Sequence, residues 1–328
     1  MNEYIESWHD EKEHFELKDG FHLRRAEGKE FGVYETIYSN MDLELSFSWN
    51  KQTNRDNSSD LFWIIKNTTR IGGIHLSPNR CGSFFMITPY IYDRYDILNV
   101  IHYALLEWSD RDKEIKLYGV TSQDVGYYSK LGYQIVYERR VMIRPTRIEK
   151  SINWSDEYTV RTPSLLDVED LGQLFHDSYN RGIDYKVFGQ QNLEEATANA
   201  KRIIEIYESN DTLEGSILVF DKKEHKLIAA CIAGISGYCD NDFSEIGDVV
   251  VNPWYRKLGL ATKMIQHSLS NLHSISPATI LCVTVGNPAE HLYRKIGFFP
   301  GIKFASMVLN ESVVADNCTQ KVGRVWEN

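Results

Sequence analysis

The segment from Asp248 to Ala261 constrains the fold of this chain most strongly, because strand-like periodicity changes to helical periodicity across a short basic turn. Three successive β-branched residues predict a buried strand: Val249, Val250 and Val251. Pro253 ends that strand, since proline has no N–H group to donate to a sheet. Apolar residues then recur at helical spacing, namely Leu258, Ala261, Met264, Ile265 and Leu269. The sequence therefore predicts a strand, a basic loop and a helix in succession.

The turn between this strand and helix has the composition of an anion site. Arg256 and Lys257 supply positive charge, and Gly259 lets the backbone come close to a ligand. The first N–H groups of a helix have no partner within it and point outward. A pyrophosphate group suits this arrangement.

Two motifs in this half of the chain resemble those of one enzyme family. Arg256-x-x-Gly259-x-Ala261 after a strand resembles the acetyl-CoA pyrophosphate loop of the GNAT family of N-acetyltransferases. Downstream, a strand at 280–285 precedes a segment similar to the family's Asn-x-x-Ala-x-x-x-Tyr-x-x-x-Gly-Phe pattern. That segment contains Asn287, Ala289, Tyr293, Gly297 and Phe298, with Asn287 one residue closer to the others than in the family pattern. The resemblance covers roughly Tyr158 to Leu309.

The resemblance implies acetyl-CoA as the cofactor and a set of residues that contact it. This set comprises Val249, Val250, Val251, Arg256, Lys257, Leu258, Gly259, Leu260, Ala261, Thr262 and, toward the pantetheine arm, Asn287. Backbone N–H groups near Val250 and Val251 are expected to polarise the thioester carbonyl.

The resemblance also implies two catalytic residues. Tyr293 is expected to donate a proton to the departing thiolate, and Glu245 is the first choice for the base. Asp248 is the competing base. It lies three residues further on, and would face the opposite side of an unbroken strand.

A second copy of the fold is expected in the N-terminal half. Tyr128, Gly132 and Tyr133 match Tyr293, Gly297 and Phe298 at an offset of 165 residues. A repeat of this size indicates two copies of one domain rather than a solenoid. The first copy has no glycine between Ile87 and Leu98, where the loop would lie, so we expect no CoA there.

The predicted fold class is therefore α/β (α+β), with two GNAT-like domains that each contain a mixed, mostly antiparallel sheet flanked by helices. A degenerate domain without a CoA loop is expected over residues 1–148, and a polar linker over 149–157. The catalytic domain is expected over 158–311, followed by a C-terminal tail at 312–328.

Charge and composition limit the classes of partner. A formal net charge of −10 argues against nucleic acid and anionic lipid, and is compatible with a cationic amine substrate. Between Val250 and Pro300 the balance is locally basic, from Arg256, Lys257, Lys263, Arg294 and Lys295 against Glu290. A polyphosphate cofactor would favour such a patch, although a solvated helix face would also explain it.

Five cysteines without a Cys-x-x-Cys pair indicate neither a disulfide framework nor a zinc site, and we expect no metal. The polar start and the absence of a long apolar segment predict a cytoplasmic protein with no membrane partner. As a monomer or homodimer, it is expected to transfer an acetyl group from acetyl-CoA to a primary amine of a small molecule. Two alternatives remain open: a non-catalytic CoA-binding protein on the same scaffold, and an N-acetyltransferase that acts on proteins.

Overall fold

The computed structural model describes residues 5–38, 56–87, 92–149, 152–180, 182–188, 192–236 and 243–309. These residues form two compact units. Unit 1 holds the described residues up to Glu138 together with Lys303–Leu309, and unit 2 holds those from Arg139 to Ile302. No helix among the described residues is both long enough and apolar enough to cross a bilayer.

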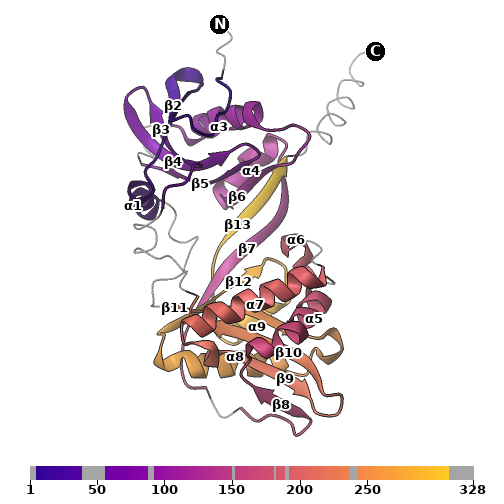
Figure 1. Ribbon diagram of the computed structural model, residues 1–328. Coiled ribbons are helices and arrows are strands. Elements are labelled where there is room, and N and C mark those ends of the chain that lie inside the picture. The colour runs from indigo at the N-terminus through magenta and orange to yellow at the C-terminus, as the bar shows by residue number, and fades with distance from the viewer. Residues whose placement is uncertain are drawn as a thin grey trace, which may run out of the picture. The chain divides into compact units, whose positions relative to one another are not determined.

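The two units exchange their last strands. The part of β7 (Gln134–Pro145) from Arg139 on pairs antiparallel with β12 (Ala278–Thr284) in unit 2. Conversely, the end of β13 (Phe299–Leu309) pairs antiparallel with β6 (Ile115–Thr121) in unit 1. In Figure 1 the yellow β13 accordingly runs beside β6, and the magenta β7 beside β12.

The division expected from the sequence, with domains at 1–148 and 158–311, follows the chain linearly. In the structure, residues 139–148 lie in unit 2 and residues 303–309 in unit 1. Local periodicity identifies a strand but not its partner.

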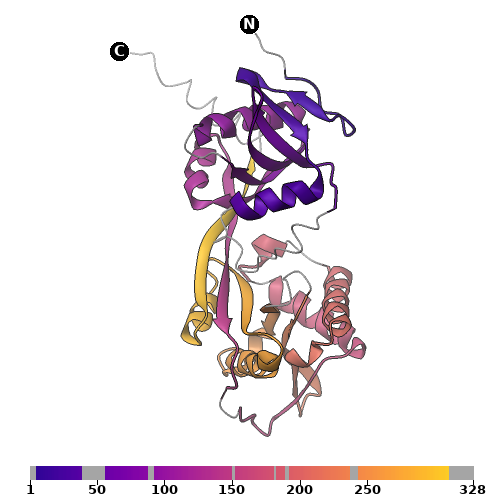
Figure 2. The same cartoon turned by 90° about the vertical axis from the view of Figure 1, so that its left-hand side faces the viewer.

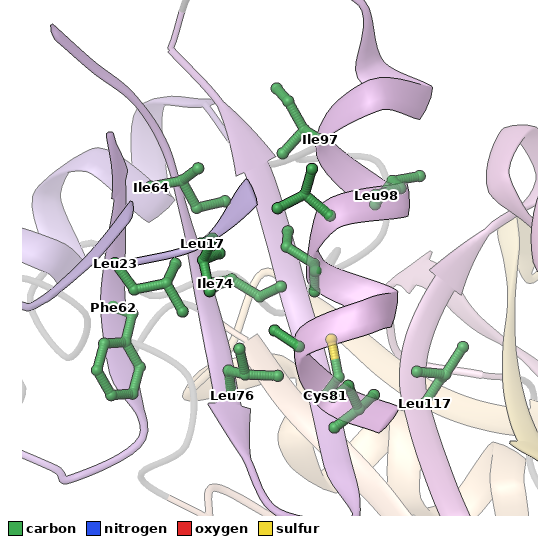
Figure 3. Close-up of a cluster of buried hydrophobic side chains, with 14 of the residues drawn as sticks. Leu17, Leu23, Phe62, Ile64, Ile74, Leu76, Cys81, Ile97, Leu98 and Leu117 are labelled. Atoms are coloured by element: carbon green, nitrogen blue, oxygen red, sulfur yellow. The ribbon is translucent and has the colours of Figure 1, made fainter. Parts of the chain in front are cut away.

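Unit 1 is a seven-stranded sheet in the order β1-β2-β3-β4-β5-β6-β13. All its neighbouring strands are antiparallel except β5 and β6, which are parallel. Its other elements are β1 (His14–Glu16), β2 (Phe21–Arg25), α1 (Gly28–Tyr38), β3 (Leu61–Lys66), β4 (Thr69–Ser77), β5 (Arg80–Met86), α3 (Arg94–Trp108) and α4 (Ser122–Lys130). Figure 3 shows the larger of its cores, where Ile97 and Leu98 of α3 pack on strand residues such as Leu23, Ile74 and Leu117.

Unit 2 is a six-stranded sheet in the order β7-β12-β11-β10-β9-β8. Its strands are antiparallel except β11 and β12, which are parallel. Its other elements are β8 (Tyr158–Arg161), α5 (Val168–Tyr179), α6 (Tyr185–Phe188), α7 (Leu193–Ser209), β9 (Ile217–Asp221), β10 (Lys226–Gly234), β11 (Phe243–Val251), α8 (Leu260–Asn271) and α9 (Ala289–Lys295).

Strand alternation places the helices of unit 2 on two faces of the sheet. Along β9, Ile217 and Val219 pack with α8, whereas Leu218 packs with α5 and α7. Figure 2 shows the pink helices α5 and α7 on one face and the orange α8 on the other. Helices cover both faces of each unit, which confirms the predicted fold class.

The internal repeat is visible in the ends of α4 and α9. Gly132 and Gly297 follow these helices with φ of 97° and 100°. In each copy the residue after this glycine donates its backbone N–H to the carbonyl of the matching tyrosine. Tyr133 donates to Tyr128 at 3.1 Å, and Phe298 donates to Tyr293 at 2.9 Å. The two segments therefore share their local backbone geometry as well as their residues.

A charged cluster in unit 1 couples stability to pH. His75 contacts Asp60 at 3.3 Å and Glu35 at 3.6 Å. Burial acts to lower the pKa of His75, but hydrogen bonds to both carboxylates outweigh it and raise that pKa. The hydrogen bond from His75 is also the main reason that the pKa of Asp60 is lowered.

We expect His75→Gln to lower the free energy of unfolding by about 2 kcal/mol near pH 6. The contribution of His75 is complete below its ordinary pKa of 6.5 and is lost as pH rises through its raised folded pKa. At the acidic end, the contribution of Asp60 is lost as pH falls through its lowered folded pKa. Calorimetric unfolding between pH 5 and pH 9 checks this, with the exposed His9→Gln as control; an equal effect at every pH would contradict the assignment.

Candidate active site

The parallel strands β11 and β12 separate and open a cavity in unit 2. They pair from Phe243 with Ala278 as far as Ile246 with Leu281, and the pairing then ends although both strands continue. A cavity of about 690 Å³ lies there, lined by the ends of both strands, the start of α8, α9 and the end of α5. The opening gives a ligand access to backbone groups that would otherwise pair within the sheet.

A β-bulge in β11 determines which side chains reach this cavity. Ile232 of β10 pairs with Asp248, but its neighbour Ala233 pairs with Ile246, which leaves Gly247 as the extra residue. The alternation of side chains is thereby reset, and Glu245 and Asp248 both contact tyrosines of the α5 and α7 face. The expectation that these carboxylates face opposite sides is wrong because the strand is not unbroken.

Of the two candidate bases, Asp248 lines the cavity and Glu245 does not. The Asp248 side chain is buried, and the hydroxyl of Tyr179 at the end of α5 donates to its Oδ1 atom. Burial raises the pKa of Asp248 to about 6, against the opposing effect of the Tyr179 hydrogen bond. Burial also raises the pKa of Tyr179, so this phenol keeps its proton and remains a donor. A carboxylate with such a pKa can accept a proton near neutral pH.

Glu245 lies in the paired part of β11, and the cavity lining does not include it. The hydroxyl of Tyr207, on α7, donates to its Oε1 atom at 2.9 Å. The negative charge of Glu245 acts with burial to raise the pKa of Asp248. Its position favours an electrostatic influence on Asp248 over direct contact with a substrate.

Backbone donors of β11 point into the opening. The N–H group of Asn252 donates to the carbonyl of Ile228 on β10 at 2.8 Å. Alternation along an antiparallel strand therefore turns the N–H groups of Val249 and Val251 toward the opposite side, where β12 has separated. The expectation from the sequence names Val250 and Val251; all three valines line the cavity, and Val249 and Val251 have the required backbone direction.

The basic turn after β11 forms the other end of the cavity. Lys257 and Gly259 both have positive φ, 67° and 79°, and Gly259 immediately precedes α8. A side chain at Gly259 would meet no protein atom within 4 Å, so the space before it is open to a ligand. The cavity lining includes the first residues of α8 at 260–262, whose N–H groups have no acceptor within the helix.

Leu258 departs from its expected place in this turn. The helix begins at Leu260, so Leu258 precedes it, and its side chain is 55% exposed rather than part of the apolar helix face. Every other residue expected to contact the cofactor lines the cavity, from Val249 to Asn287.

Tyr293, on α9, also lines the cavity. The side chain is buried, and burial raises the pKa of its phenol above the ordinary value of 10, so the phenol is protonated at neutral pH. Asp184 and Asp248 add to this rise, because negative charges disfavour the phenolate. The side chain is therefore suited to donate a proton rather than to accept one.

Asn287 lines the cavity and also forms hydrogen bonds with other groups of the protein. Its Oδ1 accepts from the N–H of Ala289 at 2.9 Å, at the start of α9, and its Nδ2 donates to Asp184 at 2.8 Å. The hydroxyl of Thr284 donates to the other oxygen of Asp184 at 2.7 Å. Asp184 thus joins the segment after α5 to the turn between β12 and α9.

The structure separates the cationic residues of this region into two groups. Of the five cations expected to form a patch, Arg256 and Lys257 line the cavity. Lys263 instead donates to the carbonyl of Asn153 at 2.9 Å, and Arg294 pairs with Glu290 at 2.8 Å. Among these five cations, the ones that line the cavity therefore belong to the turn.

The corresponding helix start in unit 1 has a different structure. Asp93 precedes α3, and its carboxylate accepts from the N–H of Tyr95 at 2.7 Å. The neighbouring Arg94 is held by both oxygens of Asp124 at 2.7 Å. A carboxylate of the protein thus occupies one of the N–H groups that an incoming phosphate would use, which favours the expectation that unit 1 takes no CoA.

Sequence patterns did not identify several polar residues of the cavity wall. Tyr179, Asp184 and Arg139 all line it, and Arg139 comes from the exchanged strand β7. None belongs to a motif, because their positions depend on tertiary contacts. The β-bulge at Gly247 did leave a signal in the sequence, since a glycine inside a strand pattern often marks a bulge.

Comparison with known proteins finds similarity to one family over part of the chain. Residues 181–298 match the model of the Acetyltransferase (GNAT) family. A GCN5-related N-acetyltransferase from Sphaerobacter thermophilus has a similar fold, with a TM-score of 0.64 and 13% identity over 89% of this chain and 96% of that one. No curated protein matches the sequence.

Two further solved structures share the fold at lower similarity. A tandem GNAT protein from the clavulanic acid biosynthesis pathway has a TM-score of 0.52 and 9% identity, over 88% of this chain and 98% of that one. A GNAT-family acetyltransferase from Colwellia psychrerythraea has a TM-score of 0.51 and 10% identity, over 87% of this chain and 98% of that one.

Proposed function

We propose that this chain, whose residues 181–298 form a domain of the GNAT acetyltransferase family, transfers an acetyl group from acetyl-CoA to an amine of a small molecule. The observation that carries the proposal is the composition of one cavity wall. A helix start preceded by an open glycine, a buried carboxylate and a protonated tyrosine all line the same space.

The residues present fit acetyl-CoA. The first N–H groups of α8, together with Arg256 and Lys257, would hold the pyrophosphate, since a helix start favours anions. The N–H groups of Val249 and Val251 are directed toward the opening, where a pantetheine arm would lie between the separated strands. Acetyl-CoA would supply the activated acetyl group.

The residues of the chain then have distinct roles in our proposal. Asp248 accepts a proton from the attacking amine, for which a pKa of about 6 is suitable. The outward N–H groups of β11 stabilise negative charge on the carbonyl oxygen, as an oxyanion hole does. Tyr293 donates a proton to the leaving thiolate. The base role moves from Glu245 to Asp248 because Asp248 lines the cavity.

The proposed acceptor is a cationic amine before it loses its proton. Asp184 and Asp248 line the cavity, and Glu245 lies three residues before Asp248 on the same side of β11. The net charge of −10 favours the approach of such a molecule to the chain.

Calorimetric titration with acetyl-CoA, followed by a screen of small amines for thiol release, tests the proposed function. We expect one equivalent of acetyl-CoA per chain, bound in unit 2, and turnover with at least one amine. Binding without turnover on small amines or peptides would favour a non-catalytic CoA-binding protein, and turnover on peptides alone would favour a protein acetyltransferase. Two equivalents would contradict our interpretation of unit 1.

Tyr293→Phe should separate proton donation from binding. The substitution removes the phenolic proton and keeps the ring that packs against Phe298, whose centroid lies 6.1 Å away. We expect kcat to fall by roughly 10²-fold, while the affinity for acetyl-CoA changes little. Steady-state kinetics with calorimetry on the same preparation checks this, and an unchanged kcat would assign Tyr293 to packing alone.

A further inference from the structure

Two histidines and a glutamate gather on one face of unit 1, at the edge of its sheet. His14 and Glu16 lie two residues apart on β1, and His22 stands directly opposite Glu16 on β2. Side chains of a strand alternate, and the intervening Phe15 and Leu23 point into the core. The three polar side chains therefore share the outer face.

The potential ligand atoms of this group already lie close together. Nε2 of His14 is 2.7 Å from Oε1 of Glu16, and the rings of His14 and His22 have centroids 4.8 Å apart. One ligand atom from each of the three residues lies within 4.8 Å of the others. Ligands about 2.0–2.2 Å from one zinc ion stand roughly 3.3–3.5 Å apart in a tetrahedron, so small side-chain rotations would complete the geometry.

From this arrangement we propose that His14, Glu16 and His22 form a binding site for a divalent transition metal such as zinc. Two imidazoles and one carboxylate are a ligand set that zinc accepts, with water in the remaining position. The side chains of His14 and Glu16 are 45% and 61% exposed, so an ion can enter from solvent.

The ion would connect the edge strand to its neighbour. β1 has three residues and pairs with β2 alone, so two ligands from β1 and one from β2 would hold this short strand in register. The expectation of no metal considered cysteine spacing and missed a His-x-Glu pair followed by a histidine across a tight turn. Arg24, opposite His14 on the same face, weakens the attraction for a cation but leaves the three ligands in place.

Titration of ZnCl₂ into the full chain without a histidine tag tests the site. We expect one equivalent to bind and the melting temperature of unit 1 to rise with zinc concentration, because the ion binds the folded state. Glu16→Gln and His22→Gln should each weaken binding by roughly tenfold or more. His225→Asn, in an exposed turn of unit 2, should leave it unchanged.

Cobalt(II) absorption identifies the ligands independently of affinity. The site should give the bands of nitrogen and oxygen ligation, and both triad variants should lose them. Thiolate charge-transfer bands would place the ion on a cysteine and overturn the proposal, as would the absence of 1:1 binding or equal binding by all variants. Because these substitutions are at the surface, the metal-free melting temperature should not change, which separates lost ligation from lost folding.

Discussion

Asp248→Asn should reduce kcat/KM for amine acetylation by about 10²–10⁴-fold and leave the affinity for acetyl-CoA nearly unchanged. The amide keeps the shape of the side chain and can still accept the hydrogen bond from Tyr179, but it cannot accept a proton from the amine. Kinetics on the best acceptor of the amine screen, with calorimetric titration of acetyl-CoA, checks both parts.

The matched control is Glu245→Gln on the same strand. Glu245 accepts a hydrogen bond from Tyr207 and does not line the cavity, so its neutral variant should retain activity within a few fold. A large loss in Glu245→Gln with little loss in Asp248→Asn would return the role of base to Glu245.

The pH dependence gives a second test of the same assignment. A base must be deprotonated, so kcat/KM of the wild type should fall as pH drops below the Asp248 pKa of about 6. The residual kcat/KM of Asp248→Asn should not show this fall at acidic pH. An unchanged acidic limb in the variant would show that another group titrates there.

Asp248→Asn should also melt no lower than the wild type at neutral pH. The folded pKa of Asp248 lies above its ordinary value of 3.8, so the folded state binds more protons and stability falls as pH rises between about 4 and 6. A folded pKa of about 6 in place of 3.8 corresponds to a cost on the order of 3 kcal/mol at pH 7. An uncharged amide avoids most of that cost, so lost activity would not reflect unfolding.

Residues whose structural effect depends only on their neighbours along the chain could be predicted from the sequence. The β-branched run at 249–251, the proline after it and the glycine before α8 each act through backbone chemistry that adjacent residues determine. Tyr293 was found because the spacing of Ala289, Tyr293 and Gly297 resembles a family pattern that lies within one short segment. These features fix the strand, the anion turn and one proposed catalytic side chain.

Features that depend on which strands pair, and in which register, could not be predicted in the same way. The exchange of β7 and β13 depends on which sheet edge each strand meets, and Arg139 reaches the cavity through that exchange. The bulge at Gly247 changes one residue of register and brings Asp248 to the side of Glu245. The pairing of β1 with β2 likewise brings His22 beside Glu16.

Gly259→Asp should abolish detectable acetyl-CoA binding, with an expected loss of 10²-fold or more in affinity, on the order of 3 kcal/mol. The new carboxylate would lie before the first N–H groups of α8, where the pyrophosphate is proposed to bind, and would both repel it and occupy its donors. Unit 1 shows the same arrangement naturally, since Asp93 accepts from a backbone N–H at the start of α3.

Gly259→Asn is the matched control, because it differs from aspartate in charge but hardly in size. Both residues tolerate the left-handed conformation that Gly259 adopts at φ 79°, and neither would meet a protein atom near its Cβ. Asparagine should therefore weaken binding less than aspartate, and both variants should melt near the wild-type temperature. Equal losses in the two variants would indicate that the backbone, rather than charge at the helix start, determines affinity. Unimpaired binding by Gly259→Asp would place the pyrophosphate elsewhere and remove the main support for the proposed cofactor site.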